Sequence, residues 1–148
     1  MNCFLMSFKP QFAEEILNGH KDCEVRTYLG AINEGDLLLV YESGPVMSIT
    51  GYFTAGPSMA VKSHDLISAL TRLCSKMPRD NEEFILKNYL KPGRKILIIK
   101  VMNPTKLSKP IPLNQLRGIG ITIPRSYVRI DELICREIIM GKALNHRQ

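Results

Sequence analysis

With 148 residues, 45% hydrophobic and 23% charged, the chain has the composition of a folded globular protein and not of a disordered one. The length fits one domain covering residues 1–148. The formal net charge of +6 is unevenly spread, because residues 1–90 carry 8 Lys/Arg against 11 Asp/Glu and residues 91–148 carry 12 against 3. This concentration of positive charge favours an anionic partner, with nucleic acid as the leading candidate.

The apolar runs exclude a membrane-spanning helix, since the longest are far shorter than the roughly 20 residues that such a helix needs. The N-terminal residues also lack the basic cluster and the small-residue cleavage site of a signal peptide. We therefore expect a cytoplasmic protein with no membrane partner.

The first part of the chain predicts strands around one helix. Residues 3–8 form a short apolar strand, Pro10 opens a helix, and Gly19 can end it in a left-handed conformation. Apolar and polar residues alternate over 22–28, which predicts a half-buried strand. Two further strands, at 37–42 and 46–55, are separated by a turn at 43–45 and predict a hairpin.

From about residue 63 the spacing of apolar residues changes to that of helices. Ser63 can cap a helix with an apolar stripe as far as Cys74, and Asp80 with Glu83 has capping-box spacing for a helix that ends before Pro92. Residues 95–102 predict a strand, 103–130 are rich in Pro and Gly and predict mostly loop, and 131–140 predict a helix with Ile130, Leu133, Ile134 and Ile138 on its apolar face.

This order of elements predicts an α+β protein. Sequence-adjacent strands joined by short turns favour a small, mostly antiparallel and partly open β-barrel with covering helices. The four cysteines, Cys3, Cys23, Cys74 and Cys135, are far apart, with no CxxC pair and no histidine at zinc-ligand spacing. We expect four reduced thiols, as is usual in the cytoplasm, and neither a metal nor a cofactor.

Several short elements of the first third of the chain occur together in one known family. Lys9-Pro10 follows the first strand, and Gly19-His20-Lys21 ends the first helix. The next strand carries Glu24-Val25-Arg26. Gly35-Asp36 precedes the apolar strand, and the hairpin that follows contains Gly44-Pro45 and Gly51. In these elements the sequence resembles the ASCH domain of the PUA-like superfamily.

The resemblance implies a PUA-like β-barrel whose cleft is lined by the Gly-x-Lys and Glu-x-Arg segments. It also implies RNA binding or a coactivator role, which are the activities associated with these domains. One bacterial branch hydrolyses an acylated cytidine nucleoside. That branch resembles this chain at Lys21 but has a threonine where Glu24 stands, so the resemblance to it is incomplete.

Lys21, Glu24 and Arg26 form the centre of the predicted site. Glu24 and Arg26 share a face because they lie two residues apart on a strand. Lys21 could hold a phosphate or act as a base, and Glu24 could serve as a general base. Lys9 precedes the first helix, where the helix N-terminus and the lysine would suit a phosphate. Arg117, Arg125, Tyr127 and Arg129 interleave arginine with one aromatic ring, a pattern that suits single-stranded RNA binding and equally fits a tyrosine packed in the core with the arginines in water.

Three functions are compatible with these residues. The first is an RNA- or nucleotide-binding ASCH-type protein of RNA metabolism or transcription coregulation. The second is a hydrolase of a modified nucleoside or RNA, with Lys21 and Glu24 as the catalytic pair. The third is an interaction module that holds a peptide or small ligand, so the pattern leaves open whether the protein is an enzyme.

Overall fold

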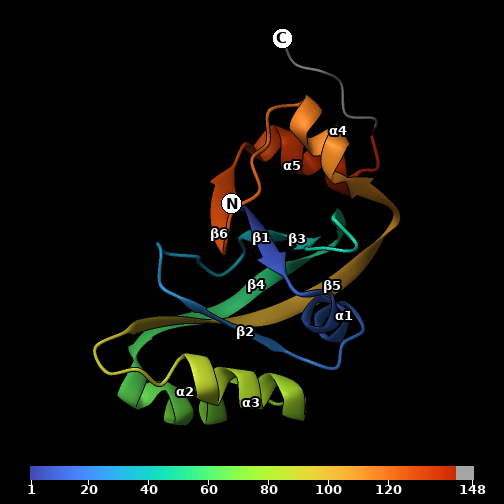
Figure 1. Ribbon diagram of the computed structural model, residues 1–148. Coiled ribbons are helices and arrows are strands. Elements are labelled where there is room, and N and C mark those ends of the chain that lie inside the picture. The colour runs from blue at the N-terminus through green and yellow to red at the C-terminus, as the bar shows by residue number, and fades with distance from the viewer. Residues whose placement is uncertain (143–148) are drawn as a thin grey trace.

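The computed structural model describes residues 1–142, which form one curled six-stranded sheet with helices around it (Figure 1). The strands are β1 (Cys3–Phe8), β2 (Cys23–Thr27), β3 (Leu37–Glu42), β4 (Ser48–Lys62), β5 (Lys95–Pro112) and β6 (Tyr127–Ile130). The helices are α1 (Pro10–Leu17), α2 (Leu66–Leu73), α3 (Arg79–Asn88), α4 (Leu113–Gly118) and α5 (Glu132–Ile139), with a 3₁₀ turn η1 (Ser63–Asp65) before α2. The α+β class and the mostly antiparallel, half-barrel sheet confirm the prediction.

The sheet has the order β2-β5-β4-β3-β1-β6, and its neighbours are antiparallel except for β1 and β3. The predicted hairpin is formed by β3 and β4, with Leu37 opposite Thr54. The parallel pair places β1 between β3 and β6, so the end of β1 lies beside the segment that leads into β6. Parallel neighbours need a crossover connection, which here contains α1 and β2.

The two long strands, β4 and β5, extend well beyond the predicted segments. The expectation of a mostly irregular segment at 103–130 is wrong, because β5 continues to Pro112 and α4 and β6 follow it. Register shifts opposite Tyr52–Thr54 and Ile49–Gly51 leave Pro104 and Pro110 outside the paired positions. A proline has no N–H to donate to a sheet, so bulges of this kind let a strand pass through proline positions.

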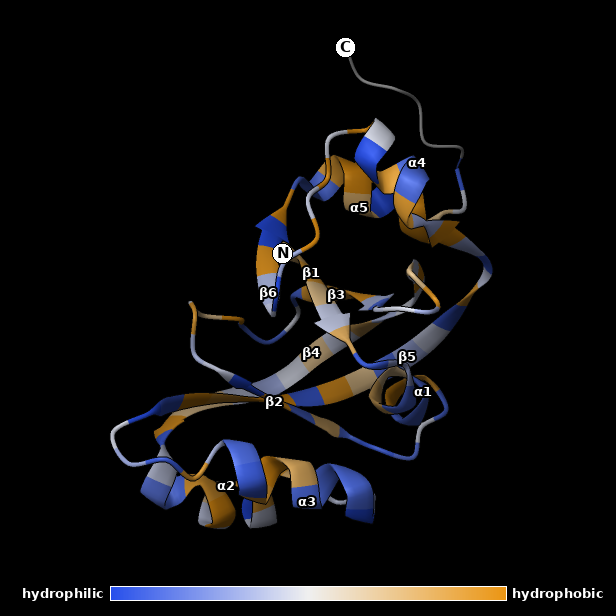
Figure 2. Cartoon of the chain, viewed as in Figure 1, coloured by the Kyte–Doolittle hydropathy of each residue, from blue (hydrophilic) through white to orange (hydrophobic). Residues whose placement is uncertain are grey.

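Helices cover the sheet in separate groups, with α2 and α3 at one end and α4 and α5 at the other (Figure 1). Each carries both apolar and polar residues, as Figure 2 shows. Leu66 and Ile85 are buried on the inner face of the α2–α3 group. Cys135 and Ile138 are buried on the inner face of α5. The predicted apolar face of the last helix is partly wrong, because Leu133 is 53% exposed and Cys135 takes an inner position.

Neither predicted side-chain cap is present at α2 or α3. Ser63 begins the 3₁₀ turn instead of capping α2 directly, and the N-cap of α3 is Pro78 without a side-chain hydrogen bond. None of the helices within residues 1–142 combines the length and the apolar character needed to cross a membrane.

Helix α1 lies close against the sheet because β4 has a glycine beneath it. A Cβ atom on Gly51 would lie 2.5 Å from the carbonyl oxygen of Thr105 and 2.6 Å from Cδ2 of Leu17. Both distances are shorter than real Cβ atoms show. The glycine therefore fixes how closely α1 approaches the sheet, and with it the position of the loop that follows α1.

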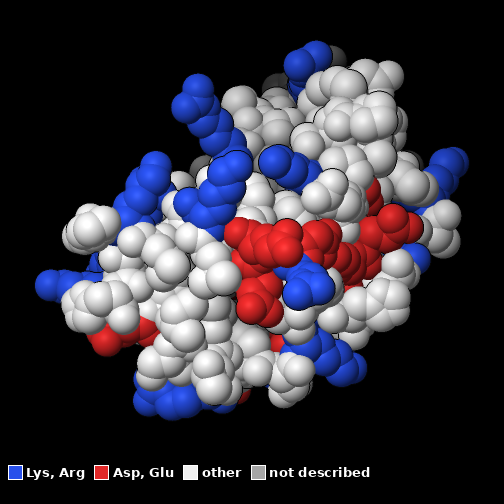
Figure 3. Space-filling view, turned by 60° about the horizontal axis from the view of Figure 1, so that its bottom comes forward, with Lys and Arg blue, Asp and Glu red and all other residues white. Residues whose placement is uncertain are grey.

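Helix α3 faces α1 through aromatic and acidic side chains. The rings of Phe12 and Phe84 have centroids 5.1 Å apart. On the face shown in Figure 3, which includes the α2–α3 side of the molecule, Asp and Glu side chains gather in one patch with Lys and Arg around it. Burial and the neighbouring carboxyl of Asp80 raise the pKa of Glu15 to about 7.

This raised pKa predicts a pH dependence of stability. The pKa of Glu15 is about 7 in the folded chain against 4.5 for the free group. The contribution of the protonated carboxyl to the free energy of unfolding is therefore fully present below pH 4.5 and is lost as the pH rises through about 7. Glu15→Gln should remove this loss. Urea unfolding from pH 4 to 8 should therefore show the variant gaining stability over the wild type between pH 4.5 and 7.

The neighbouring exposed Glu14 provides the control, since Glu14→Gln makes the same chemical change on α1. Its difference from the wild type should stay constant over this range. A Glu15→Gln difference that is equally flat would contradict the assignment. Asp80, Lys21 and Glu24, which also act on Glu15, are kept in both variants.

Candidate functional site

A buried carboxylate, Glu24, stands between two cations. Its Oε1 accepts a 2.7 Å hydrogen bond from Nζ of Lys21, and its Oε2 accepts a 2.7 Å bond from Nε of Arg26. Exposure is 2% for Lys21, 5% for Glu24 and 8% for Arg26. Lys21 lies in the loop that follows α1, and the other two residues lie on β2, where their spacing places both on one face.

Arg26 connects this pair to two other parts of the chain. Its terminal nitrogens donate to the carbonyl oxygen of Ser7 at 2.6 Å and to that of Ser126 at 3.1 Å. One of them also donates to the Ser126 hydroxyl at 3.2 Å. The guanidinium carbon is 4.7 Å from the ring centroid of Phe8. A single side chain therefore joins β2, the end of β1 and the residue before β6.

The charge state of Glu24 follows from its neighbours. Burial alone would raise the pKa of its carboxyl, but the charges of Lys21 and Arg26 and their hydrogen bonds outweigh burial and hold the pKa below its usual value. The carboxylate is thus ionised at neutral pH, with each oxygen engaged by a cation. This arrangement suits a residue that positions cations better than one that accepts a proton during a reaction.

A cavity of about 360 Å³ opens beside this ion network, between α1, α3 and the ends of β1 and β2. Its volume lies within the range of small-molecule sites, about 300–1,000 Å³. The charged residues that line it are Lys9, Lys21, Glu24, Arg26 and Arg125, and the aromatic ones are Phe8, Phe12, Phe84 and Tyr89.

Five of the predicted site residues meet at this cavity. Lys21, Glu24 and Arg26 are buried at its inner side, while Lys9 and Arg125 are exposed. Nζ of Lys9 lies 4.9 Å from the ring centroid of Phe84, so the lysine at the start of α1 reaches across to α3.

The other predicted residues lie elsewhere. Tyr127 is 7% exposed and packs in the core, with its ring edge-on to Phe4 at 6.2 Å. Its hydroxyl donates to the carbonyl oxygen of Gly30 at 2.9 Å and accepts from the backbone N–H of Leu29 at 2.6 Å. Core atoms therefore cover the ring that was expected to stack on RNA. Arg117 and Arg129 are exposed but do not line the cavity.

Sequence reasoning missed the contribution of α3. Asn81 and Phe84 line the cavity from this helix, and Tyr89 does so from the position directly after it. Burial together with the charge of Glu24 raises the pKa of the Tyr89 hydroxyl, which keeps its proton at neutral pH. The spacing of these residues predicted only an amphipathic helix. Nothing in it indicated that the helix would pack across from α1.

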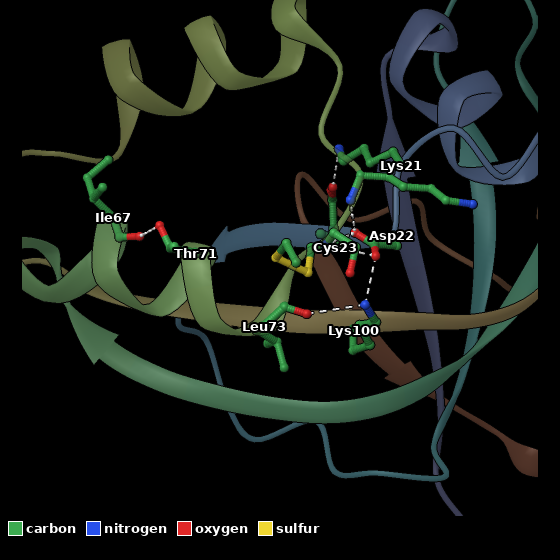
Figure 4. The surroundings of a disulfide bond; sticks show 11 residues. Lys21, Asp22, Cys23, Ile67, Thr71, Leu73 and Lys100 are labelled. Carbon is green, nitrogen blue, oxygen red and sulfur yellow. Dashed lines mark hydrogen bonds and ion pairs between the residues drawn. A yellow bond between two sulfur atoms is a disulfide. The ribbon is translucent and has the colours of Figure 1, made fainter.

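The loop that carries Lys21 is held by a disulfide beside it. Cys23 is bonded to Cys74 at the end of α2 (Figure 4), and Cys3 is bonded to Cys135. The expectation of four reduced thiols is therefore wrong. Asp22 adds to this link by accepting hydrogen bonds from the backbone N–H groups of Ser75 and Lys76, which follow Cys74. It also accepts a 2.7 Å hydrogen bond from Lys100 of β5.

A metal would find few ligands here. Within residues 1–142, the one cluster of three candidate ligand atoms consists of Asp22, Cys23 and Cys74. Its two sulfur atoms are bonded to each other and provide no thiolate.

Comparisons with known proteins bear on the fold. The sequence matches no family model and no curated protein sequence. Among solved structures, a point mutant of the ASCH protein of Zymomonas mobilis superposes with a TM-score of 0.78 at 18% identity, covering 95% of this chain and 96% of that one. The unmutated Zymomonas ASCH protein gives 0.75 at 19% identity, covering 94% of each chain.

A more distant likeness is to the N-terminal domain of McrB from Staphylothermus marinus. It has a TM-score of 0.60 and 11% identity, with 93% of each chain covered. The curled sheet, the covering helices and the Zymomonas superpositions together show that this chain has the fold of ASCH-domain proteins.

Proposed function

We propose that this protein binds single-stranded RNA or a nucleotide, with one nucleotide held in the cavity between α1 and α3. The observation that carries the proposal is the lining of the cavity, which contains four cationic side chains, one carboxylate and four aromatic rings. Cations attract phosphate and aromatic rings stack on bases, and both contacts are typical of single-stranded nucleic-acid sites. Such an activity suits a role in RNA metabolism or transcription coregulation.

The cations divide into two kinds. Lys9 and Arg125 are exposed at the cavity and can adjust to a phosphate from solvent. Lys21 and Arg26 are buried and held by Glu24, so their positions are set before any ligand arrives. Fixed donors lose little conformational entropy on binding, which favours recognition of a defined group.

The hydrolase interpretation has weaker support. It needs Glu24 to take or give a proton, whereas both oxygens of this carboxylate are hydrogen-bonded to cations. Incubation with an N-acylated cytidine nucleoside tests it directly. Release of the acyl group by the wild type but not by Lys21→Ala would favour the enzyme, and absence of turnover would count against hydrolysis of this nucleoside.

Salt dependence tests the contacts between the cavity cations and phosphate. Binding of a fluorescent ten-nucleotide RNA should weaken with salt by about 0.7 in the log–log slope for each phosphate neutralised. Arg125→Ala should therefore make the slope less negative by about 0.7. Arg117→Ala, which removes the same charge from an exposed arginine outside the cavity, should leave the slope unchanged.

Equal slopes for the two variants would show that RNA does not use the cavity. Failure of the wild type to bind RNA at low salt would remove RNA as the ligand of the proposed function.

The ring of Phe84 is the surface on which we expect a base to stack. Phe84 is half-buried, lies 5.1 Å from Phe12 and lines the cavity. Phe84→Leu should weaken RNA binding about tenfold without changing the salt slope, because a stacked base contributes about 1–3 kcal/mol and no charge is lost. Fluorescence anisotropy at several salt concentrations measures both quantities.

Leu86 on the same helix provides the control. It is 38% exposed and does not line this cavity, so Leu86→Ala should bind RNA as the wild type does. Circular dichroism of both variants verifies that α3 is retained. Unchanged affinity in a folded Phe84→Leu would argue against base stacking on this ring.

A further inference from the structure

Asn81 is a buried amide with an unused hydrogen-bond acceptor. It lies in the first turn of α3, is 3% exposed and lines the cavity, and its Oδ1 has no hydrogen-bond partner within the described residues. Buried polar atoms are nearly always paired, so each exception needs an explanation. Asn88 on the same helix follows the usual pattern, since its Nδ2 donates to the carbonyl oxygen of Phe84 at 2.8 Å.

The neighbouring donors are directed to other acceptors. The Lys21 ammonium donates to Glu24, and the Arg26 guanidinium donates to Glu24, Ser7 and Ser126. These bonds leave the Asn81 acceptor without a partner among the described residues, and a donor on a ligand in the cavity would supply one. That donor must belong to a group small enough for a volume of about 360 Å³.

The same helix provides a surface for a flat ring. Phe84 lies one helical turn after Asn81, with its ring centroid 5.1 Å from that of Phe12 and 6.3 Å from that of Tyr89. A carboxamide and an aromatic ring that line one cavity from one helix face are the two elements of nucleobase recognition, hydrogen bonding at the edge and stacking on the face.

We propose that Asn81 recognises adenine in this cavity. An asparagine carboxamide pairs with adenine at two atoms, accepting from the 6-amino group and donating to an adjacent ring nitrogen. The base would stack on Phe84, and its phosphate would meet Lys9 and Arg125. This inference rests on the proposed nucleotide-binding function and adds to it the identity of the base and the residue that selects it.

The test uses two probes that differ only in the 6-amino group, adenosine 5′-monophosphate and purine riboside 5′-monophosphate. Isothermal titration calorimetry on the wild type should give about tenfold tighter binding of adenosine monophosphate, which can form the pair with the carboxamide. Asn81→Leu, which keeps a similar volume, should bind the two probes equally. Asn88→Leu, which changes the same residue type outside the cavity, should keep the tenfold ratio.

Equal affinity of the wild type for the two probes would overturn the inference, and this comparison does not depend on the folding of any variant. A tenfold ratio that persists in Asn81→Leu would overturn it too, as would tighter binding of cytidine monophosphate. If the ten-nucleotide RNA binds and adenosine monophosphate does not, this inference fails while the proposed function stands. If neither binds, both fail.

Discussion

The double ion pair of Glu24 with Lys21 and Arg26 is the interaction on which the site depends. A buried carboxylate is costly unless cations and hydrogen bonds compensate it, and here each of its oxygens has a cation at 2.7 Å. Because Arg26 also donates to the backbone of Ser7 and Ser126, the network connects three segments that are distant in sequence. The inner side of the cavity is therefore held by contacts within the protein, and its cations are in place before a ligand binds.

The opposite side of the cavity is formed by a helix in the long connection between β4 and β5. Helix α3 contributes Asn81 and Phe84, Tyr89 follows it directly, and the helix faces α1 through rings and carboxyl groups. The Cys23–Cys74 disulfide joins the end of α2 to β2 next to Lys21. The ion network thus lines one side of the cavity, and aromatic rings in and next to α3 line the other. This arrangement suits a ligand that has a charged group at one end and a planar ring at the other.

Most of the elements followed from local pattern. The alternation around Cys23 and Val25 predicted β2, and the apolar run at 37–42 predicted β3. The extent of β5 did not follow, because Pro104 and Pro110 indicate a loop unless bulges remove them from the pairing, and pairing partners lie far away in sequence. The disulfides were missed for a similar reason, since spacing along the chain does not show which sulfur atoms the fold brings together.

The same division applies to the site. The sequence by itself determined that Glu24 and Arg26 share a strand face, that Lys21 follows a helix end, and that positive charge gathers in the C-terminal part. Only the tertiary structure decided that Tyr127 is a core residue, that Arg125 joins the cavity while Arg117 does not, and that α3 closes it. The physical reason is that periodicity fixes which side of an element is buried, whereas a cavity depends on which elements pack opposite each other. That choice is made by contacts such as the Arg26 bonds to Ser7 and Ser126, which no local pattern contains.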